Sequence, residues 1–534
     1  MRFHALLLFS LLATASAQTP NADDVVWEKA VQKFDAARAA LLRQVDAGGR
    51  TGSFRPNWDS LKQYQVPAWY QDAKFGIFLH WGVYSVPAFG NEWYPRNMYN
   101  QGTPEFAHHV ATYGPQAKFG YKDFIPMFKA ENFDAKAWAD LFRKAGAKYV
   151  IPVAEHHDGF AMYNSDLTDW CAAKMGPHRD TTGELAQAVR AAGLHFGVSS
   201  HRAEHYFFLN VARESDSDVR DPQFAAFYGP AHVGVTDKNG LHWQGGHPDA
   251  AYLDDWMARV AEMVGKYQPE IVWFDWWIET KEFAPYLQRL AAFYYNDAAR
   301  RGSTAAINYK FDAFPPGAAV LDIERGQSDQ ILPLFWQTDT SVSIKSWGYI
   351  NDDTFRSPES LVQQLVDIVS KNGALLLNVG PKSDGTIPEQ ARNVLLAMGH
   401  WLSINGEAIY GTRPWKISGE GPTKVVGGSF HDTATKPYTS RDIRFTTRDG
   451  LLYAIALAWP QDGKIKIQSL ARGSKVMESE VAGVQLLGSG DRLKWTRDND
   501  GLEIELPAAR TGDFAWVFKI TPAGRKQHAG GPAD

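Results

Sequence analysis

Short apolar runs alternate with amphipathic helical patterns along most of this 534-residue chain, and this alternation restricts its fold more than any other feature. Seven runs are typical of buried strands: 77–79, 148–154, 195–200, 270–275, 305–309, 320–324 and 374–380. Helical patterns lie between them at 134–144, 184–190, 254–267 and 358–371. This order predicts βα units around a parallel sheet, and the eight strands that we expect favour an irregular (β/α)8-like TIM barrel over an open doubly wound sheet. No Gly-x-Gly-x-x-Gly motif follows the first strand, which argues against a dinucleotide-binding fold.

The sequence changes in character on both sides of the barrel region, which we place at residues 65–410. After it, short apolar runs separated by Gly, Asp and Asn turns predict a C-terminal antiparallel β-sandwich over 411–523. These runs are 443–447, 451–457, 464–467, 483–487 and 502–506. Before it, residues 18–64 contain a helical pattern that ends at Gly48-Gly49 and predicts a helix packed on the barrel. We expect residues 524–534 to be disordered, and we find no internal repeat.

The N-terminus has the pattern of a secretory signal peptide over residues 1–17. Arg2 gives a charged start, residues 5–13 are apolar, and Ala15-Ser16-Ala17 offers a cleavage site before Gln18. This apolar run is too short to span a bilayer, and no later run is long enough. Cys171 is the only cysteine, so no intrachain disulfide is expected. We therefore predict a periplasmic or secreted protein without a membrane span.

Composition excludes some classes of function and leaves others open. Hydrophobic residues make up 44% and charged residues 22%, as in an ordinary folded protein. A net charge of −5 gives no electrostatic reason to expect nucleic acid as a partner. Aromatic residues reach 13%, with 19 tryptophans, which suits binding to sugar faces but suits large cores equally well.

Polar residues follow several of the predicted strands, where a parallel barrel opens into its active-site mouth. The strand ends and the loops after them present His80, Glu92, Trp93, His156, His157, Glu204, Asp275 and Glu324. Asp275 ends the run Glu270-Ile-Val-Trp-Phe-Asp275, which we expect to be central to the site. Each residue also has a structural alternative: Asp275 could cap the next helix, and His80 could be an ordinary hydrogen-bonded core histidine.

Three kinds of chemistry could use this set of residues. Metal hydrolysis is suggested by His156-His157, but adjacent histidines of an extended segment point to opposite sides, and no His-x-His or His-Glu-x-x-His spacing is present. Ser-His-Asp acyl transfer lacks a Gly-x-Ser-x-Gly elbow. Glycoside hydrolysis needs one carboxylate as nucleophile and a second, about 5 Å away, as acid/base. This inventory fits glycoside hydrolysis best, with no metal and no cofactor.

Several ordered motifs closely resemble glycoside hydrolase family 29, the α-L-fucosidases, over roughly residues 65–415. They include Lys74-Phe-Gly-Ile-Phe-Leu-His80-Trp81-Gly82, Asn91-Glu92-Trp93-Tyr94, Glu155-His156-His157-Asp158-Gly159-Phe160, Trp273-Phe-Asp275, Ser346-Trp347-Gly348-Tyr349, Leu377-Asn378-Val-Gly-Pro381 and Asn405-Gly-Glu-Ala-Ile-Tyr-Gly-Thr-Arg-Pro-Trp415. The resemblance implies a retaining exo-α-L-fucosidase on an irregular barrel with a C-terminal β-sandwich. Its expected partner is a fucosylated oligosaccharide or glycoconjugate. The oligomeric state is not indicated.

The resemblance also implies roles for individual residues. Asp275 would be the nucleophile, and the residues matching the fucose pocket are His80, Glu92, Trp93, His156, His157 and Trp273. Glu324, in Asp322-Ile-Glu324-Arg325-Gly326, resembles the acid/base segment of one branch of the family, and burial together with Asp275 should raise its pKa. The alternatives for this role are Glu204 and Glu279, and Glu324 could instead form a salt bridge or cap a helix.

Two segments depart from the family pattern. Asn308-Tyr309-Lys310 stands where many members carry Asn-Asp-Arg, so Lys310 would offer the substrate a point charge in place of a planar fork. Ser199–His205 stands where many carry a tyrosine-rich segment. We expect both at the pocket rim, where they would affect leaving-group preference. A catalytically silent fucose-binding protein and an α-L-galactosidase remain the alternative functions.

Overall fold

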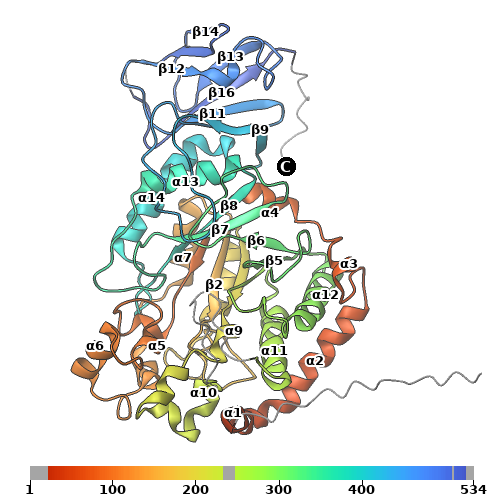
Figure 1. Ribbon diagram of the computed structural model, residues 1–534, viewed down its shortest axis with the longest axis vertical. Helices are drawn as coiled ribbons and strands as arrows, with labels where there is room; N and C mark the ends of the chain where they lie inside the picture. Colours follow the sequence, from red (N-terminus) through yellow and green to blue (C-terminus); the bar gives the residue numbers. More distant parts are fainter. Residues whose placement is uncertain (1–21, 233–246, 508–509, 525–534) are drawn as a thin grey trace, which may run out of the picture.

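The computed structural model describes residues 22–232, 247–507 and 510–524. It consists of a large barrel region and a smaller β region stacked on one end of it (Figure 1). The expected signal peptide at 1–17 lies outside the described residues, as does nearly all of the tail at 524–534. Among the residues described, no helix combines the length and apolar character needed to cross a membrane.

Eight parallel strands form a closed barrel in the order of the sequence, which confirms the predicted fold class. The strands are β1 (Phe75–Leu79), β2 (Tyr149–Glu155), β3 (His195–Ser200), β4 (Ile271–Phe274), β5 (Ala306–Tyr309), β6 (Val320–Asp322), β7 (Trp336–Ser341) and β8 (Gly373–Val379). The barrel closes where β1 pairs with β8, with Ile77 opposite Leu377. Every residue of β1, β2, β4, β5 and β8 is buried, because helices cover the outside and side chains fill the inside.

The strand β7 was not among the runs that the sequence indicated. Its sequence, Trp-Gln-Thr-Asp-Thr-Ser, is polar although all six residues are buried. Neighbouring residues of the strand face opposite sides, and both sides are hydrogen-bonded: the Gln337 amide donates to Asp322 at 2.5 Å, and the Thr338 hydroxyl donates to the Gly326 carbonyl of the segment after β6 at 2.7 Å. A strand whose polar side chains are all satisfied by tertiary contacts carries no hydrophobic pattern.

The outer layer contains α7 (Ala135–Lys144), α8 (Thr181–Ala191), α11 (Ala250–Tyr267), α12 (Ala284–Arg300), α13 (Pro358–Ser370) and α14 (Glu389–Asn405). The sequence indicated all of these except α12 and α14. Shorter α-helices are α3 (Trp58–Leu61), α4 (Ala68–Ala73), α5 (Tyr94–Asn97), α6 (Pro104–Tyr113), α9 (Arg202–His205) and α10 (Ala225–Tyr228). The 3₁₀ segments are η1 (Gln32–Phe34), η2 (Val83–Ser85), η3 (Tyr121–Met127), η4 (Asn210–Glu214), η5 (Asp218–Arg220), η6 (Pro222–Phe224), η7 (Gly406–Ala408) and η8 (Gln468–Leu470).

The N-terminal segment forms two helices, α1 (Ala22–Val31) and α2 (Asp35–Arg50), where the sequence predicted one. The helix α2 lies against α11 and α12 on the outside of the barrel (Figure 1). A Cβ added at Gly48 would lie 2.6 Å from the Phe293 ring, so this glycine permits the close approach of α2 and α12.

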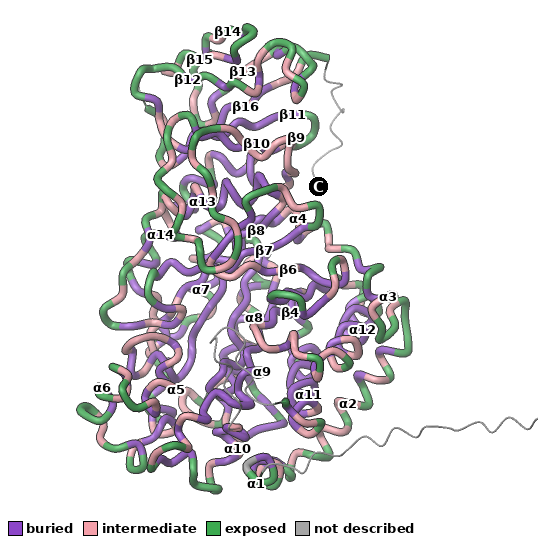
Figure 2. The backbone as a smooth tube through the Cα atoms, viewed as in Figure 1, coloured by how far each residue is buried: buried purple, intermediate pink, exposed green. Residues whose placement is uncertain are grey.

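The C-terminal region contains two antiparallel sheets, as predicted for a β-sandwich. One has the order β13-β16-β11-β10-β9 and the other β12-β15-β14. The strands are β9 (Arg413–Glu420), β10 (Ile443–Arg448), β11 (Leu451–Ala456), β12 (Lys464–Ile467), β13 (Val481–Leu486), β14 (Trp495–Arg497), β15 (Leu502–Glu505) and β16 (Trp516–Pro522). This region has its own hydrophobic cluster, and the longest stretches of buried backbone follow the barrel strands (Figure 2).

Candidate active site

A cavity of about 530 Å³ lies at the carboxyl ends of the barrel strands, a size suited to a small ligand. Its walls are formed by His80, Glu92, Trp93, His156, His157, His201, Glu204, Trp273, Asp275, Trp276, Trp277, Glu279, Phe311, Glu324, Asp339, Trp347 and Phe430. Of the nine residues to which the sequence gave a catalytic or sugar-binding role, eight are in this set, and Lys310 is the exception. Asp275 and Glu324 therefore face one common cavity.

Asp275 directly follows β4 and is held by two histidines. Its Oδ2 atom lies 3.0 Å from Nδ1 of His201 and 3.4 Å from Nε2 of His157. The next helix, α12, begins at Ala284 with Phe283 at its N-cap, so the alternative that Asp275 caps a helix is wrong. His201 comes from the end of β3 and His157 from the turn after β2, so three neighbouring strands converge on this carboxylate.

The charges around Asp275 keep it ionised. Burial acts to raise the pKa of its carboxyl, but the interactions with His201 and His157 outweigh burial and hold the pKa well below its usual range. Burial likewise opposes the charged form of His157, yet Glu204 and Asp275 raise the pKa of His157 to about 9. His157 is therefore an imidazolium between two carboxyl groups, with Glu204 at 3.1 Å from its Nδ1.

His201 is neutral, because burial lowers its pKa. Its tautomer follows from its neighbours: Nδ1 must carry the proton that is donated to Asp275, and Nε2 accepts from the Ser199 hydroxyl at 3.0 Å. His201 thus positions Asp275 without neutralising its charge.

Glu324 lies just beyond β6 on another part of the cavity wall. Burial raises the pKa of its carboxyl and Asp275 raises it further, while Lys310 and the Trp276 indole oppose this shift. The Trp276 Nε1–H donates to Oε2 of Glu324, and the Lys310 ammonium lies 3.8 Å from the same atom. The pKa values of the two carboxyl groups are therefore moved apart, that of Glu324 upwards and that of Asp275 downwards, which is the direction that acid catalysis beside a nucleophile requires.

Lys310 is buried beneath the cavity, so its expected position at the rim is wrong. Its Nζ forms ion pairs with Asp322 at 2.8 Å and with Asp339 at 2.5 Å, and it lies 4.8 Å from the centre of the Trp273 ring. A buried ammonium needs such partners, since desolvation without them is very unfavourable. The residues His201 and Glu204, also expected at the rim, are buried in the cavity wall.

Two further histidines present neutral nitrogens to the cavity. Burial lowers the pKa of both His80 and His156 well below the usual value. The Asn378 side-chain oxygen accepts from Nδ1 of His80 at 2.8 Å, which leaves Nε2 of His80 as an acceptor. Nδ1 of His156 is buried and has no hydrogen-bond partner among the described residues. The Nε2 atom of His80 is thus suited to accept a hydrogen bond from a ligand hydroxyl group.

The donor set could also approach a metal ion. Ligand atoms of His80, His156 and His201 lie within 4.8 Å of one another, as do those of His157, His201 and Asp275. Both ring nitrogens of His201 are already hydrogen-bonded, to Asp275 and to Ser199. A metal in either group would break one of these bonds, so the arrangement fits a hydrogen-bonded organic ligand better.

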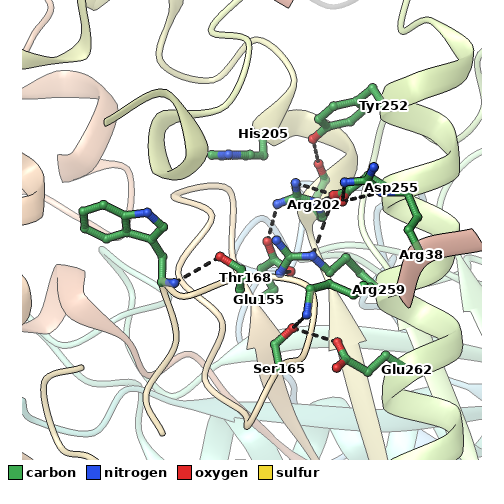
Figure 3. Close-up of polar contacts among 12 residues, drawn as sticks. Arg38, Glu155, Ser165, Thr168, Arg202, His205, Tyr252, Asp255, Arg259 and Glu262 are labelled. Atoms are coloured by element: carbon green, nitrogen blue, oxygen red, sulfur yellow. Dashed lines mark hydrogen bonds and ion pairs between the residues drawn. The ribbon is translucent and has the colours of Figure 1, made fainter. Parts of the chain in front are cut away.

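A buried ionic network joins residues that neighbour the cavity histidines in the sequence (Figure 3). Arg202 follows His201 and bonds Glu155 at 2.5 Å and Asp255 of α11 at 2.7 Å. Glu155 in turn precedes His156. Arg259 lies 3.4 Å from Glu155, and Arg38 of α2 donates to Asp255 at 3.0 Å. The network ties the ends of β2 and β3 to α11 and to the N-terminal helices, which fixes the backbone that carries the histidines.

Sequence reasoning expected His201 only at the rim, and it did not assign Trp276, Trp277, Phe311, Asp339, Trp347 or Phe430 to the cavity. His201, Trp276 and Phe311 each follow a strand, so the strand-end criterion could have identified them. Trp347 was part of a family motif without an assigned role. Phe430 lies in the C-terminal segment between β9 and β10, and nothing in its local sequence indicates that it reaches the barrel.

Comparison with known proteins gives consistent matches over most of the chain. A family model described as alpha-L-fucosidase matches residues 41–407, and one described as alpha-L-fucosidase C-terminal domain matches residues 435–521. The tissue alpha-L-fucosidase of Rattus norvegicus is 32% identical over 494 residues, which cover 90% of this chain and 96% of the relative. The plasma alpha-L-fucosidase of Homo sapiens is 33% identical over 491 residues, covering 88% and 92%.

Solved structures agree with these sequence relatives. The alpha-fucosidase of Thermotoga maritima, in complex with fucose, is 33% identical with a TM-score of 0.69, and the match covers 88% of this chain and 100% of that chain. The alpha-L-fucosidase isoenzyme 1 of Paenibacillus thiaminolyticus is 26% identical with a TM-score of 0.63, covering 86% and 99%.

Proposed function

This chain belongs to the α-L-fucosidase family of glycoside hydrolases, and on that premise we propose that it is a retaining exo-α-L-fucosidase with Asp275 as nucleophile and Glu324 as acid/base. The observation that carries this proposal is the pair itself: Asp275, whose pKa is lowered, and Glu324, whose pKa is raised, line the same cavity. Two carboxyl groups divided in this way are the requirement of double displacement at a sugar.

In the first step, the Asp275 carboxylate attacks the anomeric carbon of the fucosyl residue. The bond from that carbon to the leaving oxygen breaks as Glu324 transfers its proton to the oxygen. A covalent fucosyl-enzyme forms on Asp275, and Glu324 is left as a carboxylate. Because the pKa of Asp275 is low, its carboxyl group is ionised and has a lone pair free to attack the anomeric carbon.

In the second step, Glu324 takes a proton from a water molecule, whose oxygen attacks the same anomeric carbon. The bond to Asp275 breaks, and fucose leaves with its original anomeric configuration after two inversions. Glu324 has regained its proton, so the enzyme is ready for another cycle. The Lys310 ammonium, beneath Glu324, stabilises the carboxylate that exists between the two steps.

The remaining wall residues would bind the sugar. His80, His156 and Glu92 offer nitrogens and a carboxylate to its hydroxyl groups, and the Trp273 and Trp93 rings offer apolar faces to its ring and methyl group. The similar alpha-fucosidase of Thermotoga maritima was solved in complex with fucose, which supports fucose as the ligand of this cavity. Lys310 acts through Glu324 and Trp273, because it lies beneath them.

Hydrolysis of 4-nitrophenyl α-L-fucoside tests the function, with the α-L-galactoside as the matched comparison. We expect turnover of the fucoside and a lower kcat/KM for the galactoside, whose extra hydroxyl must enter an apolar part of the site. Tight fucose binding without turnover would establish the silent binding protein instead. A higher kcat/KM for the galactoside would establish an α-L-galactosidase.

We also propose export through a cleaved leader at residues 1–17, to the periplasm or the medium. N-terminal sequencing of the mature protein tests this, and a start at Gln18 is expected. The domain division is likewise proposed: residues 18–64 support the barrel of 65–410, and residues 411–523 form the β-sandwich. A mature protein that retains Met1 would contradict the leader.

A further inference from the structure

Three aromatic side chains from separate segments meet at the mouth of the cavity. Trp276 follows β4, Phe311 follows β5, and Phe430 comes from the C-terminal segment between β9 and β10. Phe311 is 57% exposed and Phe430 is 59% exposed, while Trp276 is half-buried. Large aromatic rings exposed to this degree around a cavity are characteristic of a ligand surface.

The rings are arranged around Trp276. Its ring centre lies 6.3 Å from that of Phe430 with an angle of 16° between the planes, and 6.3 Å from that of Phe311 with an angle of 31°. The Trp276 indole also donates its N–H to Glu324. The aromatic surface therefore begins at the carboxyl group that protonates the leaving oxygen, so a group bonded to that oxygen would lie against it.

The segment that carries Phe430 is fixed to the barrel. The Phe430 N–H donates to the Glu324 carbonyl at 2.9 Å, and the Asp432 N–H donates to the Arg325 carbonyl at 2.8 Å. The Asp432 carboxylate forms an ion pair with Arg356 at 3.3 Å. A Cβ at Gly326 would lie 2.0 Å from the Gly428 carbonyl oxygen, so this glycine permits the two segments to touch. Phe430 is thus held in place although its ring is exposed.

Both phenylalanines occupy the left-handed backbone region, with φ of 55° for Phe311 and 62° for Phe430. Bulky residues rarely adopt this conformation, which is unfavourable and persists where the surroundings impose it, often at ligand sites. Trp277 and Arg325, the neighbours of Trp276 and Glu324, also have positive φ, of 81° and 40°. Backbone strain is therefore concentrated on this side of the cavity.

The geometry points to a leaving-group subsite formed by Trp276, Phe311 and Phe430, which takes a hexopyranose that lays its apolar C–H face on the rings. This inference rests on the proposed function. It makes the C-terminal segment part of the substrate site: Phe430 selects which sugar may be attached to fucose, while the barrel residues select fucose itself.

The test compares two substrates that share fucose and differ in the leaving group. One is α-L-fucosyl fluoride, whose leaving group has no ring, and the other is a disaccharide of fucose α-linked to N-acetylglucosamine. For Phe430→Ala and for Phe311→Ala, we expect the ratio of kcat/KM for the disaccharide to kcat/KM for the fluoride to fall about tenfold. Phe430→Leu, which keeps apolar volume without a flat face, should give an intermediate ratio.

Leu334→Ala is the matched control, because Leu334 is 50% exposed and lies outside the cavity. It should leave the ratio unchanged. Equal losses on both substrates, or an unchanged ratio in Phe430→Ala, would overturn the subsite. If the wild type releases fluoride and none of the three variants changes the ratio of the two kcat/KM values, the subsite is overturned but the proposed function is not. A wild-type protein that turns over neither substrate would overturn the proposed function as well.

Discussion

The floor and the mouth of the cavity are built on opposite principles. The floor consists of mostly buried polar groups at the ends of barrel strands, with the hydrogen-bonded group of His157, His201 and Asp275 at its centre. The mouth consists of exposed aromatic rings on loops, one of them from the C-terminal region. A satisfied polar network accepts one arrangement of hydroxyl groups, whereas apolar faces accept many related shapes. In the proposed function, the floor therefore recognises the sugar, and the mouth recognises the leaving group.

Replacing the central carboxylate of the floor should have the largest effect. Asp275→Gly removes the nucleophile, and we expect kcat to fall by roughly four orders of magnitude or more. External azide should restore part of the turnover of an activated fucoside, because the small anion can occupy the space left by the side chain. Thermal unfolding provides the control for folding. Activity within tenfold of the wild type would show that Asp275 is not the nucleophile.

Disrupting the buried ionic network should lower the stability of the protein. Arg202→Met removes the nearest cationic partner of both Glu155 and Asp255 and leaves these buried carboxylates to Arg259 and Arg38 alone, so we expect the free energy of unfolding to fall by up to about 3–5 kcal/mol. Chemical denaturation measures it. Arg143→Met is the control, since Arg143 pairs with Asp140 on the surface and should contribute under about 1 kcal/mol. Equal losses in the two variants would contradict the distinction between buried and exposed pairs.

Acid stability tests the link between the N-terminal helices and the floor. Burial acts to raise the pKa of Asp255, but Arg202, Arg259 and Arg38 together lower it to about 2. A carboxyl with a depressed folded-state pKa stabilises the fold above its unfolded pKa, near 3.9, and loses this contribution as the pH falls towards 2. Arg38→Ala raises the folded-state pKa of Asp255, so acid unfolding followed by circular dichroism should begin at a higher pH. An unchanged acid transition would show that α2 does not support the network.

The smallest effect is expected from removing the hydrogen bond between Trp276 at the mouth and Glu324. Trp276→Phe keeps a ring but removes the N–H that Glu324 accepts, and this hydrogen bond lowers the pKa of Glu324. Glu324 should then hold its proton to a higher pH, so the alkaline limb of the kcat/KM profile should move up by about 0.5–1 pH unit. Trp459→Phe, in the β-sandwich, is the control. A downward shift would contradict the acid role of Glu324.

Sequence predicted the parts of this molecule that have a local pattern. Seven barrel strands and the residues at their ends follow from buried runs and the polar groups after them, which is how Asp275 and Glu324 were identified. The strand β7 was missed because Gln337 and Thr338 are polar and find their partners, Asp322 and the Gly326 carbonyl, only in the folded chain. Phe430 was missed because it reaches the cavity through contacts with a segment about 100 residues earlier in the chain.

The positions and roles of some polar side chains could also not be predicted from the sequence. Lys310 was expected at the rim from its position after β5, but three carboxyl groups, on Asp322, Asp339 and Glu324, draw it beneath the cavity. The role of His201 likewise depends on Ser199, which fixes its tautomer by occupying Nε2. Such roles arise from partners that only the folded chain brings together.

The most direct test of the account is covalent labelling with 2-deoxy-2-fluoro-α-L-fucosyl fluoride, followed by peptide mass spectrometry. The fluorine at C2 destabilises the positively charged transition states of both steps, whereas the fluoride leaving group speeds only the first, so the intermediate should accumulate. We predict one added fluorofucosyl group, on the peptide that contains Asp275. A label on another carboxylate, or turnover of the reagent with no covalent species and an inverted product, would contradict the central claim.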